Sequence, residues 1–196
     1  MKDDKRQKRH EAISATAYDL LASHGYGGTT MLRIAQAARA SNETLYRWYG
    51  DKDGLFHQMV EDNAAETRQL LEEALEGAGD PFETLGQVGP VFLRMLLGER
   101  AILLNRAAAA DPSGRLGAAI SAGGRQEVSA LLGQVVERLC AGQGHTAERA
   151  TGWFLDLLVG DSQIRRVIGE MPVPDEAEIA RRCRQALADF RQLIGA

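Results

Sequence analysis

Residues 43–49 have the sequence Glu-Thr-Leu-Tyr-Arg-Trp-Tyr and place charged, hydroxyl and aromatic side chains within two turns of a helix. At about 100° per residue, Leu45 and Tyr49 share one face, which we expect to point into a core. Glu43 and Arg47 lie almost opposite, on the outermost line of the helix. Hydroxyl groups flank the apolar face on both sides. Such a helix has an apolar back, polar flanks and a charged front.

This arrangement suits the major groove of DNA. An arginine on the front of the helix can donate to guanine O6 and N7, and a glutamate can accept from cytosine N4. Hydroxyl groups on the flanks can donate to the phosphates that line the groove. The alternative is that Glu43 and Arg47, four residues apart, form only a solvated ion pair.

Signals for helix ends surround this run and favour the first interpretation. Thr29 or Thr30 can cap a short helix that runs to about residue 38, and Ser41 can cap a second. Gly50 can adopt the left-handed conformation that ends the second helix, and Asp51 can cap the next. Two short helices joined by a tight turn, with a third starting at once, are typical of a helix-turn-helix.

Residues 10–56 resemble the DNA-binding domain of the TetR (tetracycline repressor) family of transcriptional regulators. The resemblance rests on an opening helix ending at His24-Gly25-Tyr26, on Thr29-Thr30, Ile34-Ala35, Ser41 and Thr44-Leu45-Tyr46, and on Gly50-Asp51-Lys52 leading to Leu55-Phe56. It implies that Thr44, Tyr46 and Lys52 contact phosphates and that the region around Asn42, Glu43 and Arg47 faces bases. The residues expected to contact DNA are Thr30, Arg33, Arg39, Ser41, Asn42, Glu43, Thr44, Tyr46, Arg47, Trp48 and Lys52.

Two positions depart from the family pattern. The turn residue that is usually glycine is Arg39, so this backbone must accommodate a side chain. The position before Thr44, often a small residue, is Glu43. An acidic group so close to the groove affects which operator sequence is read, while DNA binding itself remains the expectation.

Composition indicates an all-α fold. The 196-residue chain has five prolines, long segments rich in Ala, Leu, Glu and Arg, and no sustained alternation of period two. We expect a three-helix DNA-binding domain over residues 1–52 and a helical domain for ligand binding and dimerisation over residues 53–196. Further helices are expected at about 52–76, 81–98, 99–110, 113–123, 124–141, 146–169 and 175–194.

Charge is divided unevenly along the chain. Residues 1–60 hold nine Lys/Arg and seven Asp/Glu, a balance of +2, whereas the whole chain carries −4. The basic segment 2–10 can follow a phosphate backbone or a minor groove, or can form a solvated terminus. The acidic remainder confines contact with DNA to one end of the protein.

Other classes of function are disfavoured. The four histidines are isolated, without paired metal-ligand spacing, and no phosphate-binding loop or nucleophile motif occurs. Neither a leader peptide nor a run of 18 apolar residues is found, so we expect a cytoplasmic protein that does not enter membranes. Cys140 and Cys183 are too few for a disulfide scaffold. We therefore expect no enzyme activity, no cofactor and no metal.

The middle helices suggest an effector site. Residues 99–111, 152–154 and 160–161 resemble, less specifically, an AefR-like subset of the same family, which implies a hydrophobic pocket for a small molecule. Each expected wall residue can equally be plain core. The expected pocket residues are Phe82, Leu85, Val88, Phe92, Met95, Leu103, Asn105, Trp153 and Phe154.

Two late helices carry broad apolar stripes, over residues 124–141 and 146–169. Stripes this wide favour a four-helix interface between two copies, although a two-sided internal core is the alternative. The expected interface residues are Val128, Leu132, Val135, Leu139, Leu157 and Ile164.

The sequence thus predicts a homodimeric transcriptional regulator that binds a near-palindromic, double-stranded operator with one reading helix per copy. We expect a repressor that a small-molecule effector releases from DNA. The alternative is a helical small-molecule-binding or adaptor protein whose DNA head no longer functions.

Overall fold

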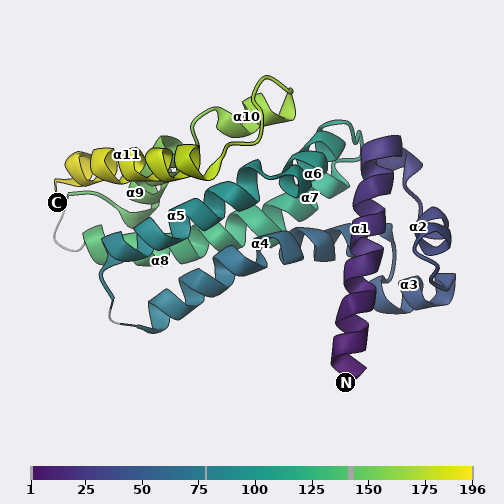
Figure 1. The fold of residues 1–196 in the computed structure, drawn as a ribbon. Coiled ribbons are helices and arrows are strands. Elements are labelled where there is room, and N and C mark those ends of the chain that lie inside the picture. Colours follow the sequence, from purple (N-terminus) through teal and green to yellow (C-terminus); the bar gives the residue numbers. More distant parts are fainter. Residues whose placement is uncertain (1, 78, 141–143, 196) are drawn as a thin grey trace. The chain divides into compact units, whose positions relative to one another are not determined.

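A computed structural model of the protein describes residues 2–77, 79–140 and 144–195. The described residues form helices joined by short connections, with no strand among them, which confirms the predicted all-α fold (Figure 1). The helices are α1 (Lys2–Gly28), α2 (Met31–Ala37), α3 (Asn42–Tyr49), α4 (Lys52–Glu76), α5 (Pro81–Leu97), α6 (Glu99–Ala109), α7 (Arg115–Ile120), a π-helical turn (Ser121–Gln126), α8 (Glu127–Cys140), α9 (Ala147–Val159), α10 (Ser162–Val167) and α11 (Glu176–Ile194).

The chain divides into two compact units. Residues 1–62 and 103–123 form the first, called here the head unit. Residues 63–102 and 124–196 form the second, called here the bundle unit. Each unit has its own cluster of buried apolar side chains, so each has its own source of stability.

Helix ends in the head unit lie where the sequence places them. The Thr30 side chain caps α2 by accepting from the Arg33 N–H, and Ser41 caps α3 by accepting from the Thr44 N–H. Gly50 follows α3 with a φ of 77°, which favours glycine. The predicted start, stop and restart of helix are confirmed by these caps.

Apolar side chains from α1 to α4 pack together inside the head unit, joined by residues of α6 and α7. Leu45 of α3 and Ile34 of α2 are fully buried there. Burial of these two side chains stabilises the short helices, because a helix of seven or eight residues is not stable in water without tertiary packing. The buried apolar residues of the head are Ile13, Ala17, Tyr18, Leu21, Tyr26, Met31, Ile34, Ala35, Leu45, Leu55, Phe56, Met59, Val60, Leu104, Ala107 and Leu116.

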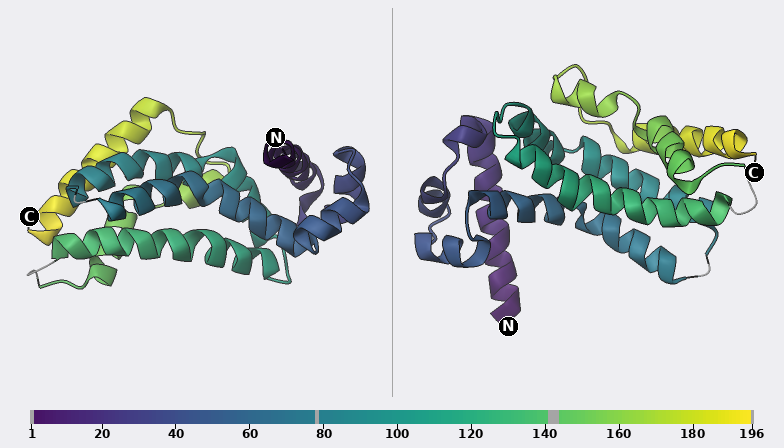
Figure 2. Two further views of the ribbon diagram at one scale, coloured as in Figure 1. Left: turned by 90° about the horizontal axis from the view of Figure 1, so that it is seen from below. Right: turned by 180° about the vertical axis from the view of Figure 1, so that it is seen from behind.

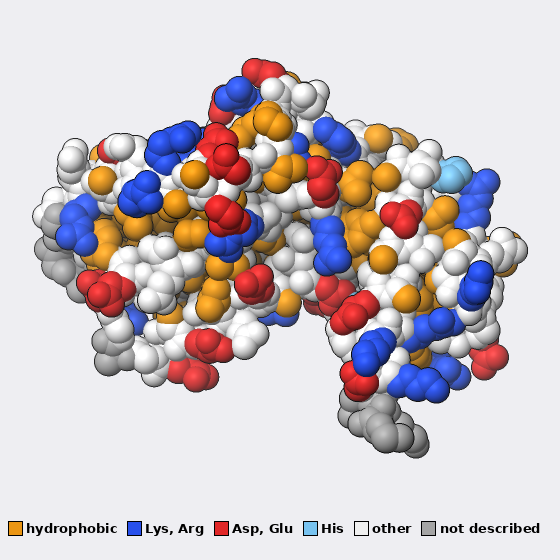
Figure 3. Space-filling view, in the orientation of Figure 1, with side chains coloured by type: hydrophobic (Ala, Val, Ile, Leu, Met, Phe, Trp, Pro, Cys, Tyr) orange, Lys and Arg blue, Asp and Glu red, His pale blue; other side chains and the backbone are white. Residues whose placement is uncertain are grey.

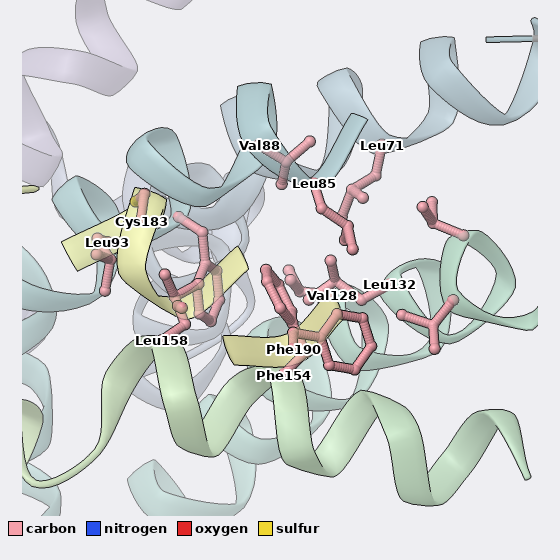
Figure 4. Packing of buried hydrophobic residues seen from close by; sticks show 14 of the residues in the cluster. Leu71, Leu85, Val88, Leu93, Val128, Leu132, Phe154, Leu158, Cys183 and Phe190 are labelled. Atoms are coloured by element: carbon pink, nitrogen blue, oxygen red, sulfur yellow. The ribbon is translucent and has the colours of Figure 1, made fainter. Parts of the chain in front are cut away.

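The bundle unit is built around α5, α8, α9 and α11. Helix α11 packs on α5 and α9, and α8 packs on α9 (Figure 2). Phe154 and Phe190 lie at the centre of its core, with ring centroids 5.4 Å apart and aliphatic side chains around them (Figure 4). Such tilted aromatic pairs add to the free energy of apolar burial.

Two predicted helices differ from the structure. The segment 146–169 is two helices, because Gly160 follows α9 with a φ of 51° and α10 begins only at Ser162. The segment 113–123 is a short α-helix followed by a π-helical turn over Ser121–Gln126. Among the described residues, no helix is long and apolar enough to cross a bilayer.

Candidate nucleic-acid interface

Helix α3 presents a charged front and a buried back. Leu45 is 0% exposed, whereas the side chains of Glu43 and Arg47 are 86% and 63% exposed. Tyr46 beside them is 50% exposed. The shortest separation between the Glu43 carboxylate and the Arg47 guanidinium is 3.9 Å, at the outer limit for an ion pair. Since an exposed pair of this length contributes little, both groups are available to a partner.

The start of α3 fixes two hydroxyl groups. Ser41 Oγ accepts from the Thr44 N–H at 3.1 Å and lies 2.7 Å from Thr44 Oγ1. Asn42, between the cap and the charged line, is exposed. Backbone N–H groups at such a helix start, together with hydroxyl groups, are suited to an anionic oxygen. The predicted phosphate and base contacts of this helix therefore share one accessible surface.

The turn between α2 and α3 depends on Arg39. Its φ is 52°, the left-handed conformation, in a position where the sequence suggested that a side chain must be accommodated. The Arg39 carbonyl accepts a hydrogen bond from the Arg9 guanidinium of α1 at 2.5 Å. In α2, the Arg33 guanidinium donates to the Gly28 carbonyl at 2.9 Å. Thr30, Arg33 and Arg39 are all exposed.

Lys52 is held by the head itself. Its ammonium donates to the Tyr26 carbonyl at 3.0 Å and lies 3.6 Å from the centre of the Tyr26 ring. Burial lowers the pKa of Lys52, while the carboxylate of Asp53, which accepts from the Tyr26 hydroxyl, acts in the opposite direction. Lys52 is therefore a weaker candidate for phosphate contact than the exposed residues of α3.

Trp48 and Tyr49 end α3 on its inner side. Trp48 is half-buried, and the Arg6 guanidinium of α1 lies 5.4 Å from the centre of its ring. The Tyr49 hydroxyl lies 2.8 Å from His10 Nδ1. His10 has no distinguishing neighbours in the sequence, so this contact could not be foreseen from it. Trp48 therefore packs partly against the core of the head unit.

Basic side chains gather on the surface over α1 and α3 (Figure 3). Lys5, Arg6 and Lys8 of α1 and Arg47 of α3 are exposed. A local positive surface attracts the phosphate backbone irrespective of base sequence. The side chains of Lys2 and Asp3 lie outside the described residues.

The expected effector-pocket residues fall into two places. Leu103 packs on the core of the head unit, and Asn105 belongs to that unit as well. Helix α6 contributes to both units, and its C-terminal part belongs to the head. The remaining seven belong to the bundle core or pack against it: Phe82, Leu85, Val88, Phe92, Met95, Trp153 and Phe154.

The expected interface residues also divide. Val128, Leu132 and Val135 are at most 2% exposed within a single chain. These three side chains therefore pack inside the bundle unit, as in the internal core that the apolar stripe also allows. Leu139 and Leu157 are partly buried, and Ile164 is 57% exposed.

Both cysteines are buried free thiols, and burial raises the pKa of the Cys183 thiol to about 11. A thiol in this state is a poor nucleophile. Within the described residues, no cluster of three or more His, Cys, Asp or Glu side chains could hold a metal ion.

Comparison with known proteins identifies the head. Residues 13–59 match the family model described as bacterial regulatory proteins, tetR family. The HTH-type transcriptional regulator HbdR of Aromatoleum sp. (strain CIB) is 34% identical over 79 residues, which are 40% of this chain and 34% of that protein. The chain thus aligns with only about a third of the length of this curated relative.

Solved structures match over nearly the whole chain. A TetR-family regulator from Mesorhizobium loti has a TM-score of 0.75 and 24% identity, covering 95% of this chain and 96% of that one. FadR from Bacillus subtilis, in complex with stearoyl-CoA, has a TM-score of 0.71 and 13% identity, covering 92% and 96%. At these identities the matches show a common fold, which includes the bundle unit.

Proposed function

Because residues 13–59 match the model of the tetR family of bacterial regulatory proteins, we propose that this chain is a transcriptional regulator of that family that binds operator DNA through α2 and α3. One observation carries the proposal. Glu43, Tyr46 and Arg47 form an exposed polar surface on a capped helix whose opposite side, Leu45, is fully buried. The similarity of the head to this family supports a role in regulation.

In the proposed complex, α3 lies in the major groove. Arg47 donates to guanine O6 and N7, and Glu43 accepts from cytosine N4. Tyr46 and Thr44 donate to phosphates on the two sides, and Ser41, Asn42, Thr30 and Arg33 add contacts near the start of the two helices. Arg47 therefore supplies sequence specificity, whereas the basic residues of α1 supply affinity that does not depend on sequence.

The test begins with selection of an operator from random duplex DNA by the full-length protein. Arg47→Ala is expected to weaken binding to the selected operator by about 5- to 150-fold, since one bidentate base contact contributes about 1–3 kcal/mol. Binding to unrelated DNA should change much less. Titration at two salt concentrations, with competitor DNA, measures both affinities.

Arg181→Ala is the matched control, because it removes the same charge from a 70%-exposed site on α11 of the bundle unit. It should leave both affinities unchanged. Failure of the wild-type protein to enrich any sequence would overturn the proposal and favour the alternative, a small-molecule-binding or adaptor protein with a non-functional head.

We further propose that the bundle unit binds a hydrophobic small molecule and that this effector releases a repressor from DNA. The support is the aromatic and aliphatic surroundings of Phe82, Phe92, Trp153 and Phe154, together with the fold shared with a regulator that binds stearoyl-CoA. The finer assignment to the AefR-like subset rests on residues 99–111, 152–154 and 160–161 alone. By linkage, DNA must weaken effector binding by the same factor as the effector weakens DNA binding.

A homodimer is also proposed, because one α3 reads only a few base pairs and two copies can read a near-palindrome with half-sites about 34–36 Å apart. The face we propose contains Ile164 and Ile168, one turn apart and 57% and 65% exposed, together with Leu157 of α9. Exposed isoleucines four residues apart are typical of a surface that a partner covers.

Ile168→Asp is expected to weaken this dimer at least about tenfold, since it places a charge in an apolar contact. Analytical ultracentrifugation over a range of concentrations measures the change. Leu32→Asp, at a 55%-exposed site on α2 of the head unit, is the control and should leave the dimer intact. An unchanged dimer in Ile168→Asp would place the interface elsewhere.

A further inference from the structure

Three helices of the head unit meet in one chain of hydrogen bonds. His10 of α1 lies with Nδ1 at 2.8 Å from the hydroxyl of Tyr49, the last residue of α3. Its Nε2 lies 2.6 Å from Oδ2 of Asp62 in α4. The His10 side chain is only 15% exposed and that of Asp62 is 38% exposed, so the contact with Tyr49 is partly shielded from water and the contact with Asp62 is more open. The imidazole thus connects the C-terminal end of α3 to two longer helices.

We propose that His10 and Asp62 are positioning residues that fix the orientation of α3 through the Tyr49 hydroxyl. The proposal rests on the proposed function, in which α3 reads DNA. None of the three side chains needs to touch a base. Their role is to hold the charged front of α3 at one angle, so that Arg47 meets its base with the correct geometry.

The length of α3 explains why such a connection matters. The helix has eight residues, and its local bonds, from the Ser41 cap to the contact of the Gly50 N–H with the Tyr46 carbonyl, do not fix rotation about its axis. Leu45 supplies one anchor on the buried face. Tyr49 lies one turn further along the same face and supplies the second. Two anchors along one line define which residues point outward.

The surroundings of His10 keep the connection intact. A pocket of about 310 Å³ borders it, lined by Arg6, Gln7, His10, Trp48, Tyr49, Gln58 and Asp62. Gln58 donates to Oδ1 of Asp62 at 3.1 Å, so both carboxylate oxygens are engaged. The charged groups around the imidazole are Asp62 of α4 and Arg6 of α1, with Trp48 and Tyr49 facing it from α3.

Both protonation states of the imidazole can keep the contact with Tyr49. A neutral ring donates a hydrogen bond from Nε2 to Asp62 and accepts one at Nδ1 from the Tyr49 hydroxyl. A protonated ring donates from both nitrogens, and the phenol oxygen then accepts. Burial raises the pKa of Tyr49, and the nearby Asp62 charge adds a smaller shift in the same direction, to about 12. The phenol therefore keeps its proton throughout the neutral range. The connection therefore depends on the geometry of the donors and acceptors.

The test uses isosteric replacements in the full-length protein. Asparagine places a polar atom where imidazole Nδ1 lies and can still bond the Tyr49 hydroxyl, whereas glutamine places one near Nε2 and can reach only Asp62. We expect His10→Gln, His10→Leu and Tyr49→Phe each to weaken binding to the selected operator by about five- to tenfold, the worth of one partly shielded hydrogen bond. His10→Asn, which keeps the bond to Tyr49 and loses the one to Asp62, should recover part of the wild-type affinity. Affinity for unrelated DNA should stay unchanged in all four.

His57→Gln is the matched control. His57 forms the same kind of pair, with Glu61 at 3.3 Å, but within α4 itself. It should bind operator like the wild type. Amide hydrogen exchange of the DNA-free proteins gives an independent readout, in which α3 should exchange faster in Tyr49→Phe than in His57→Gln.

The outcomes separate this inference from the proposed function. If the wild-type protein selects no operator, the proposed function fails, and faster exchange of α3 in Tyr49→Phe alone then decides whether the connection orders the helix. If the wild type selects an operator but His10→Gln and Tyr49→Phe bind it as tightly, the positioning role is overturned. Equal losses in His10→Asn and His10→Leu would also overturn it, because they would indicate packing and not a hydrogen bond to Tyr49.

Discussion

Replacement of Leu45 by aspartate is expected to abolish specific DNA binding while leaving the bundle unit folded. Leu45 is fully buried in the core of the head unit. Leaving an unpaired carboxylate there costs several kcal/mol, which is comparable to the whole stability of a small domain. The bundle unit has its own core around Phe154 and Phe190 and does not depend on Leu45.

Two measurements check this expectation. Specific DNA binding should fall below detection, and thermal unfolding by circular dichroism should show a helical fraction that still melts cooperatively. Leu45→Met is the control, because a volume-conserving exchange costs less than about 1.5 kcal/mol. Tight operator binding by Leu45→Asp would contradict the assignment of Leu45 to the back of the reading helix.

Interactions close in the sequence could be predicted well. Ser41 caps α3, Asp80 caps α5 by accepting from the Phe82 N–H, and Pro81 occupies the first turn, all as the residue types indicate. The start and end of α4 also agree with the sequence pattern. Each of these features depends on residues within about one helical turn, so composition and spacing suffice to identify it.

The break between α9 and α10 was missed for a physical reason. Gly160 lies in an apolar pattern that continues through Ile164 and Ile168, and periodicity alone predicts one helix. In the structure, the Arg182 guanidinium of α11 donates to the carbonyls of Leu158 and Val159 at the end of α9, at 2.5 and 2.6 Å. A partner more than 20 residues away thus stabilises the helix end.

The same distinction applies to the candidate site. The outward line of Glu43 and Arg47 follows from the helical period, so the sequence predicts it. The partners of Lys52 and Tyr49 do not follow, because Tyr26 and His10 are 26 and 39 residues away. Helix geometry determines which way a side chain points, whereas the packing of the whole unit determines what it meets.

Arg166 is the strongest example of a role that only packing reveals. An arginine on a short helix is expected at the surface, yet this one is only 6% exposed. Its guanidinium donates to the carbonyl of Leu97 at 2.9 Å, to the carbonyl of Met171 at 2.9 Å and to Glu99 at 3.1 Å. It therefore joins the end of α5 and the loop after α10 to the helix that carries it.

Arg166→Lys is expected to destabilise the bundle unit by about 2–4 kcal/mol. The planar guanidinium donates to three acceptors that lie in different directions. A lysine ammonium carries its donors on one nitrogen and cannot reach all three acceptors at once. The lost bonds leave carbonyl groups without a donor, at about 1–3 kcal/mol for each that stays buried. Glu99 adds little, because its side chain is 69% exposed and its ion pair is weakened by solvent.

Urea denaturation of Arg166→Lys and of Arg181→Lys separates this effect from the exchange of one cation for another. Arg181 is 70% exposed and lies 3.9 Å from Glu178, so its replacement should change the free energy of unfolding by less than about 0.5 kcal/mol. Equal effects of the two substitutions would show that the charge of Arg166 matters and its fork geometry does not. A large loss confined to Arg166→Lys would show instead that the carbonyls of Leu97 and Met171 depend on the guanidinium, and that the segment carrying the exposed Ile164 and Ile168 is held in place by it.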